Sequence, residues 1–163
     1  MSNSAILESL LESAPDPSLG RVIVASIEKL VARDNYLLAV DANERSITHR
    51  LAIYLQEAYP DWDVDCEYNR DGHEPKRINM ISEAIESNDE FGRTVFPDII
   101  VHKRGPNNNF LAIEVKKTTS TRSPELDFAK LQALKEQLGY RYALYLLFIT
   151  DGSSSSIKEF RWI

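Results

Sequence analysis

Two acidic residues and a lysine stand inside stretches that otherwise resemble buried strands. Asp98 belongs to the apolar run 95–101, and Glu114 and Lys116 belong to the run 110–116. Both runs are rich in β-branched and aromatic residues, which predicts two strands joined by a short loop. Because side chains alternate between the faces of a strand, Glu114 and Lys116 share a face, and Asp98 can join them if the strands pair.

Such a cluster has an evident chemistry. Two buried carboxylates side by side repel one another unless positive charge lies nearby. Magnesium supplies that charge, and proteins usually hold it through one or two carboxylates together with phosphate oxygens of the substrate. The metal would acidify a bound water, and Lys116 would position that water or stabilise its hydroxide. Asp98, Glu114 and Lys116 are therefore candidate catalytic residues for phosphodiester hydrolysis.

The pattern Pro97-Asp98 followed by Glu114-x-Lys116 resembles the signature of the PD-(D/E)XK nuclease superfamily, which has the restriction-endonuclease-like fold. The resemblance covers about residues 41–163. It implies an α/β fold with an αβββαβ core, in which helices flank a mixed central sheet. It also implies hydrolysis of DNA by an endonuclease or exonuclease with Mg²⁺, for which Mn²⁺ can substitute, in defence against foreign DNA or in repair. The metal ligands that it implies are Asp98, Glu114, Val115 and Glu44.

Glu44 has two interpretations. Residues 43–55 form an amphipathic pattern that predicts the first core helix. Members of the family commonly carry an acidic residue on this helix that points at the metal, and Glu44 is the matching position. Alternatively, Asp41 is the N-cap and Glu44, three residues later, reaches back to a backbone amide. The sequence leaves both interpretations open.

The next segment, 62–70, alternates acidic and apolar residues and predicts the first core strand. Asp63, Asp65 and Glu67 share one face, which we expect to be a solvated acidic edge, with Glu67 a peripheral candidate for the site. Residues 71–93 would then be an insertion, and it would include a short helix over 76–88.

Ser123, Pro124 and Glu125 predict the start of a helix that runs to about Leu138, with Ser123 as N-cap. Its expected buried stripe comprises Leu126, Ala129, Leu131, Leu134 and Leu138. The remaining positions, including Asp127, Lys130, Gln132 and Lys135, should be solvated. The run 142–149 is apolar on both faces, which predicts a covered strand parallel to the one that carries Glu114. The run 157–163 alternates as an edge strand does.

Residues 1–40 form an N-terminal extension to a single domain that spans 1–163. Amphipathic helical patterns cover 5–13 and 19–33, on either side of a proline-rich break. We expect these helices to pack against the core, and a dimer face is the alternative.

Charge and composition limit the possible partners. The formal net charge of −6 opposes binding to nucleic acid. Basic residues concentrate between 70 and 122, however, and an accessory DNA-reading subunit or a homodimer could supply affinity. The candidate nucleic-acid contacts are Arg70, Lys103, Lys117, Lys130 and Gln132, the last two as accessory positions at best.

A single cysteine, Cys66, and the absence of a leader-like or membrane-spanning run favour a reducing, cytoplasmic location. Of the three histidines, His49 is the best placed to supply a proton, although a structural or surface role is the expected one for each. A Gly-rich phosphate loop is absent, which disfavours other magnesium-phosphate enzymes. The remaining alternative is a catalytically silent module of the same fold that binds a protein or nucleic-acid partner and keeps the three charges as a buried network.

Overall fold

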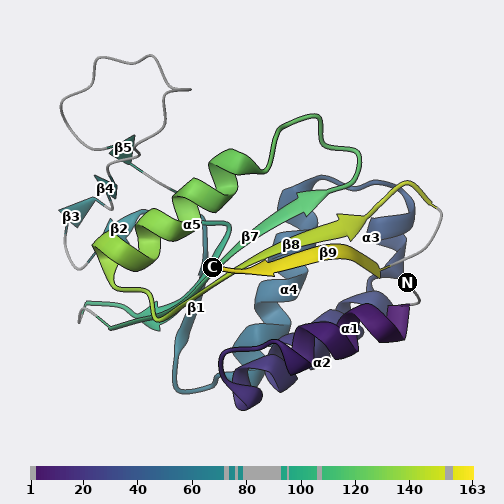
Figure 1. Ribbon diagram of the computed structural model, residues 1–163, viewed down its shortest axis with the longest axis horizontal. Coiled ribbons are helices and arrows are strands. Elements are labelled where there is room, and N and C mark those ends of the chain that lie inside the picture. Colours follow the sequence, from purple (N-terminus) through teal and green to yellow (C-terminus); the bar gives the residue numbers. More distant parts are fainter. Residues whose placement is uncertain are drawn as a thin grey trace.

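The computed structural model describes residues 3–71, 74–75, 77–78, 93–94, 96–105, 108–152 and 156–163 of the 163-residue chain. Its centre is an open, mixed sheet of five strands with helices on both faces (Figure 1). An α/β fold with a mixed sheet flanked by helices is therefore confirmed.

The sheet strands, in their order across the sheet, are β1 (Asp63–Cys66), β6 (Ile99–Lys103), β7 (Asn108–Lys117), β8 (Tyr142–Ile149) and β9 (Ser156–Trp162). The helices are α1 (Asn3–Glu12), α2 (Pro17–Arg33), α3 (Asn35–Ala39), α4 (Glu44–Ala58) and α5 (Glu125–Leu138). Outside the sheet lie a short hairpin of β2 (Arg70–Asp71) with β3 (Glu74–Pro75) and a short antiparallel pair of β4 (Arg77–Ile78) with β5 (Arg93–Thr94).

Strand direction follows from the connections. β6 is antiparallel to both β1 and β7, and β9 is antiparallel to β8. β7 and β8 are parallel because α5 carries the chain back across one face of the sheet between them. The predicted parallel pairing of the 142–149 strand and the predicted C-terminal edge strand are both confirmed.

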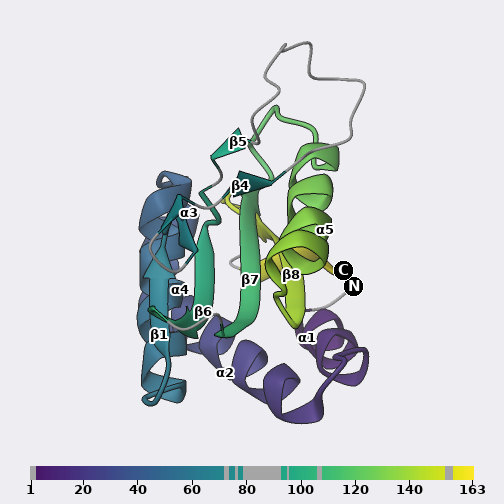
Figure 2. The same cartoon turned by 90° about the vertical axis from the view of Figure 1, so that its left-hand side faces the viewer.

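The two faces of the sheet bury different layers, and Figure 2 shows the sheet between α4 and α5. On the face toward α1, α2 and α4, Ile113 and Val115 of β7 join the larger core cluster. On the face toward α5, Ala112 packs with Leu131 and Leu134. The alternation of side chains along β7 therefore directs Glu114 and Lys116 beneath α5.

The strand predicted over 95–101 begins only at Ile99. Pro97 has no N–H to give to a strand ladder, and the carboxylate of Asp98, rather than a carbonyl, accepts the N–H of Val115. The strand predicted over 110–116 is longer than expected and begins at Asn108.

The segment before β6 differs from the prediction. The strand expected over 62–70 ends at Cys66, and Glu67 has a φ of 51°. Of the helix expected over 76–88, the structure describes Arg77–Ile78, which form a strand, so the prediction is wrong there. The rest of that range lies outside the described residues.

Helix α5 is rotated relative to the predicted stripe. Leu126 is 46% exposed, whereas Asp127 is only 8% exposed. Leu131 and Leu134 are buried as predicted, and Asp127 shares their helical face in place of Leu126. The helix also begins at Glu125 with Pro124 in the N-cap position, so the expected side-chain cap from Ser123 is not formed.

The N-terminal helices pack against the core, as expected, with α1 against β9 and α2 against α4. Asp16 caps α2 by accepting from the backbone N–H groups of Ser18 and Leu19. The short α3 is not predicted by the sequence pattern. Within the ranges given above, no helix is long and apolar enough to cross a membrane.

Gly20 sets the separation of α1 and α2. A Cβ at this position would lie 2.7 Å from Ala14 Cβ and 3.2 Å from Leu11 Cδ1. We expect Gly20→Ala to lower the free energy of unfolding by about 1 kcal/mol, because the overpacking exceeds the gain in helix propensity. Urea denaturation measures the change. The double variant Gly20→Ala/Ala14→Gly should recover the loss, and no recovery would contradict this packing.

Candidate functional site

The candidate site lies where β6 begins and β7 ends, beneath α5. Ile99 pairs with Ile113, which brings the neighbouring residues Asp98 and Glu114 side by side. The backbone N–H of Asp98 donates to Glu114 Oε1 over 3.3 Å, and Asp98 Oδ2 accepts from the Val115 N–H over 2.8 Å. The predicted meeting of the two acids is thus present in the structure.

Glu114 is 2% exposed. Burial raises the pKa of Glu114 from its ordinary 4.5 to about 8, the Asp98 carboxylate adds to the rise, and Lys130 opposes it. Burial also raises the pKa of Asp98, against the lowering effect of the Val115 hydrogen bond and the two nearby lysines. In both groups the largest cause is burial, so it is first of all the loss of water around the two carboxylates that favours their protonated forms.

Lys130 of α5 is the direct counter-ion of Glu114. Its Nζ lies 2.6 Å from Glu114 Oε2, and its side chain is only 19% exposed. Burial alone would lower the pKa of Lys130, but Glu114 and Asp98 outweigh this effect and the pKa is raised. The expectation that Lys130 belongs to a solvated face is therefore wrong. The same expectation is confirmed for Gln132, which is exposed and donates to Glu136.

Lys116 forms the second ion pair between β7 and α5. Its Nζ lies 3.2 Å from Asp127 Oδ2, and both side chains are nearly buried. Within the described part of the chain, Asp127 Oδ2 has no hydrogen-bond partner, so its contact with Lys116 is an ion pair only. The two ion pairs between β7 and α5 are therefore reciprocal. Glu114 on the strand pairs with Lys130 on the helix, and Lys116 on the strand pairs with Asp127 on the helix.

Asp127 was expected on the solvated face of its helix and was not predicted to belong to the site. The signal was available, because Asp127, Leu131 and Leu134 have the i, i+4, i+7 spacing of one helical face. Lys130 lies next to that face. A stripe defined by apolar residues alone leaves out Asp127 and Lys130. Both are nevertheless turned toward the sheet, because the strand beneath the helix carries charged residues of the opposite sign.

Glu44 is the first residue of α4 and lies close to the acids. Its Oε2 accepts from the backbone N–H of Lys117 over 3.2 Å, and its charge contributes to the raised pKa of Asp98. The proposed capping arrangement is wrong, because Asn43 is the N-cap and accepts from Ser46 N–H. Asp41 instead has a φ of 51° and binds Lys117. The metal-ligand role of Glu44 remains a prediction.

Three of the predicted nucleic-acid contacts lie elsewhere. Lys117 lies on the opposite side of β7 from Lys116, where its ammonium donates to Asp41 Oδ1 and to the Ala42 carbonyl. Its charge is therefore already paired with a carboxylate of the protein. Lys103 lies at the other end of β6 from Asp98, with Nζ 5.4 Å from the centre of the Trp62 ring. Arg70 is exposed in the hairpin β2–β3.

The acidic face of β1 is not simply solvated. Asp65 binds both His102 and Arg104, and Asp63 accepts from the backbone N–H of Arg104. Glu67, the peripheral candidate, forms an exposed ion pair with Arg45. A structural ion network along β1 and β6 therefore replaces the expected solvated edge.

The histidines do not enter the candidate site. His49 is exposed on α4, which is the surface role expected for it. His102 is buried and contacts Asp65, and His73 lies outside the described residues.

The charges of the site bear on whether it suits a metal. Asp98, Glu114, Glu44 and Asp127 face Lys116 and Lys130, which leaves two negative charges in excess when all six are ionised. A divalent cation would compensate this excess, and hard carboxylate oxygens are ligands that Mg²⁺ accepts. In the described ranges, however, no three His, Cys, Asp or Glu side chains form a group that could hold a metal ion. The residues therefore suit a metal held by two carboxylates and completed by other oxygens.

No protein-family model, curated protein or solved structure matches the chain.

The raised pKa of Glu114 predicts an unusual pH dependence of stability. Between about pH 4.5 and pH 8, the folded protein keeps a proton on Glu114 that the unfolded chain loses, so rising pH favours unfolding. In EDTA, the free energy of unfolding should fall by roughly 2–4 kcal/mol across this range. Urea titrations at several pH values measure the slope. Glu114→Gln should remove most of it, and an unchanged slope in this variant would contradict the assignment.

Proposed function

We propose that this chain is a metal-dependent nuclease of the PD-(D/E)XK type that hydrolyses phosphodiester bonds of DNA. The observation that carries the proposal is the juxtaposition of the buried Glu114 carboxylate on β7 with the partly buried Asp98 carboxylate just before β6, both with raised pKa values. Removing two neighbouring carboxylates from water costs free energy, and a bound divalent cation would compensate their charge.

The arrangement of elements supports the same proposal. In chain order, helix α4 precedes strands β1, β6 and β7, which are followed by helix α5 and strand β8. With the short strands β2 to β5 between β1 and β6 set aside, this order is consistent with the αβββαβ core that the resemblance implies. Pro97 and Asp98 directly precede β6, Glu114 and Lys116 lie on the adjacent β7, and the helix that carries Glu44 begins beside the end of β7.

Each residue has a proposed role. Asp98 and Glu114 would hold Mg²⁺ through their carboxylates, with the Val115 carbonyl as a further oxygen donor. Glu44, whose carboxylate accepts the Lys117 N–H, is a candidate third carboxylate that would have to approach them. When bound, the metal supplies a more acidic water and neutralises charge on the phosphate. Lys116 would orient the attacking water, and Asp127 would hold the Lys116 ammonium in place. Lys130 would stabilise the ionised form of Glu114, which is the form that binds metal.

A second candidate function has its own support. Glu114 with Lys130 and Lys116 with Asp127 already form ion pairs, so the charges could serve only to fix α5 on the sheet. The protein would then be a catalytically silent module of this fold that binds a protein or nucleic-acid partner. Metal binding distinguishes the two functions, because a silent module does not need it.

Cleavage is the first test of the proposed nuclease. We expect Mg²⁺- or Mn²⁺-dependent cleavage within a panel of supercoiled, linear and single-stranded DNA and RNA, with EDTA as blank. Asp98→Asn, Glu114→Gln and Lys116→Met should each lower the rate by about 100-fold or more. The exposed residues Asp61, Glu159 and Lys158 provide matched controls for the same three substitutions. Cleavage of DNA that survives in all three site variants would rule out this site.

Metal binding is the second test and does not depend on finding the substrate. Calorimetry with Mn²⁺ at pH 8 should show binding that Asp98→Asn and Glu114→Gln weaken at least about tenfold, because each removes a charged ligand. Glu159→Gln should bind as the unchanged protein does. If no Mn²⁺ binds, while Lys130→Met lowers the free energy of unfolding by about 3 kcal/mol, the silent module is the better description.

A further inference from the structure

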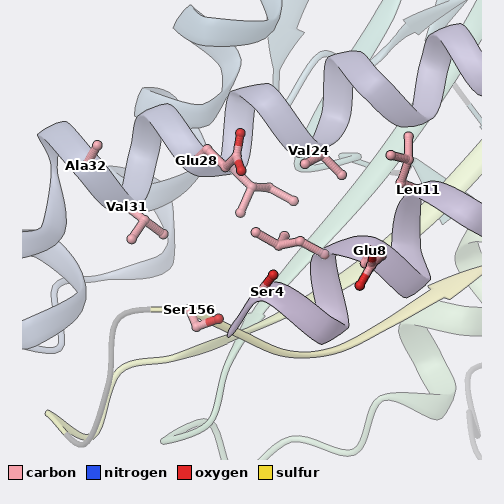
Figure 3. A pocket seen from close by; sticks show the side chains of 10 residues that line it. Ser4, Glu8, Leu11, Val24, Glu28, Val31, Ala32 and Ser156 are labelled. Atoms are coloured by element: carbon pink, nitrogen blue, oxygen red, sulfur yellow. The ribbon is translucent and has the colours of Figure 1, made fainter. Parts of the chain in front are cut away.

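An open apolar groove separates α1 from α2 on the side of the molecule formed by the N-terminal helices. Its volume is about 570 Å³, and it is lined by Ser4, Leu7, Glu8, Leu11, Val24, Ile27, Glu28, Val31, Ala32 and Ser156. Figure 3 shows Ser4, Glu8 and Leu11 on α1, and Val24, Glu28, Val31 and Ala32 on α2, with Ser156 of β9 beside α1.

The groove follows from the way the two helices pack. At the turn between them, Gly20 approaches Ala14 so closely that a Cβ would not fit. Away from this contact, the helices present side chains that only partly fill the space between them. Leu7, Val24 and Val31 pack on the core yet remain partly exposed. Each helix therefore has apolar surface beyond the part that the sheet covers.

The spacing of the lining residues resembles one side of a helix-binding seam. On α1, Ser4, Leu7 and Leu11 follow the i, i+3, i+7 pattern, and on α2, Val24, Ile27 and Val31 follow the same pattern. Two neighbouring helices with such rows form a groove into which a third amphipathic helix can place its own apolar row. The geometry thus favours a helix as the occupant.

The charges of the groove select among helical partners. Glu8 and Glu28 are both exposed and lie on opposite walls, and the lining includes no Lys or Arg. In the part of the chain that the structure describes, neither carboxylate forms an ion pair, and the adjacent Lys29 is engaged by Glu57 of α4. A second copy of this groove would bring like charges together, which disfavours a symmetric dimer through this face.

We propose that the α1–α2 groove is a docking site for an amphipathic helix of another protein, with an apolar row flanked by Lys or Arg residues. The apolar row replaces water against Leu7, Leu11, Val24 and Val31, and the basic flanks pair with Glu8 and Glu28. The site lies on α1 and α2, whereas the proposed nuclease residues lie beneath α5, so the two proposals are independent.

The test uses a labelled helical peptide of about 14 residues, roughly four turns, with leucines at i, i+3 and i+7 and lysines beside them. Fluorescence anisotropy with the full chain should show saturable binding. A peptide with glutamates in place of the lysines should bind on the order of tenfold more weakly. Equal binding of both peptides, or no binding of the lysine peptide, would overturn the proposal.

Variants locate the binding. Glu8→Lys with Glu28→Lys should reverse the preference between the two peptides, whereas Glu12→Lys, an exposed α1 position outside the lining, should not. Ala32→Trp should fill the groove and abolish binding, and Ala25→Trp on the same helix is its control, since Ala25 is also exposed and lies outside this groove.

Binding that survives both Ala32→Trp and the double charge reversal would overturn the proposal. Sedimentation velocity provides the remaining check. A dimer that Ala32→Trp dissociates would show that the occupant is a second copy of the chain, which would also overturn it. Circular dichroism shows whether each variant is folded, and the charge-reversal variant tests the groove even if Ala32→Trp fails to fold.

Discussion

The arrangement of the core depends on two carboxylates that lie side by side where β6 begins and β7 ends. Asp98 and Glu114 lie side by side because the register of β6 and β7 leaves no alternative. Their charge must be compensated from the face that Glu114 points to, and α5 is the element that covers this face. The helix therefore cannot be uniformly apolar toward the sheet, and it presents Lys130 and Asp127 among its buried leucines.

Much of the fold was predictable because its strands have clear patterns. The alternation around Glu114 and the uniformly apolar run of β8 identified the paired strands and their parallel neighbour. The juxtaposition of Asp98 with Glu114 was also predictable, since it requires only the pairing of two recognisable strands. These inferences use local periodicity, which the sequence carries directly.

The remaining features depend on contacts between distant elements. The helical spacing places Asp127 on the face of Leu131 and Leu134, but the partners that compensate Asp127 and Lys130 there are charges on β7, which lie outside α5. Likewise, Asp41 resembled an N-cap, but Lys117 at the end of β7 and Thr119 in the turn after it bind its carboxylate, and Asn43 is the cap. The partner of a charged side chain often comes from an element that is distant in the sequence. A pattern that treats every charged residue as solvated therefore fails at these positions.

The order of charges along β7 also bears on how the chain finds one strand pairing among several. Lys116 and Lys117 are adjacent yet project to opposite faces, where different carboxylates receive them. A slip of β7 by one residue would turn Glu114 and Lys116 toward the apolar layer under α4 and would bring Ile113 and Val115 beneath the charges of α5. Each misplaced charge would be desolvated without a partner. The ionic residues thus penalise wrong alignments that a purely apolar strand would tolerate, and they give this central strand a single permitted register during folding.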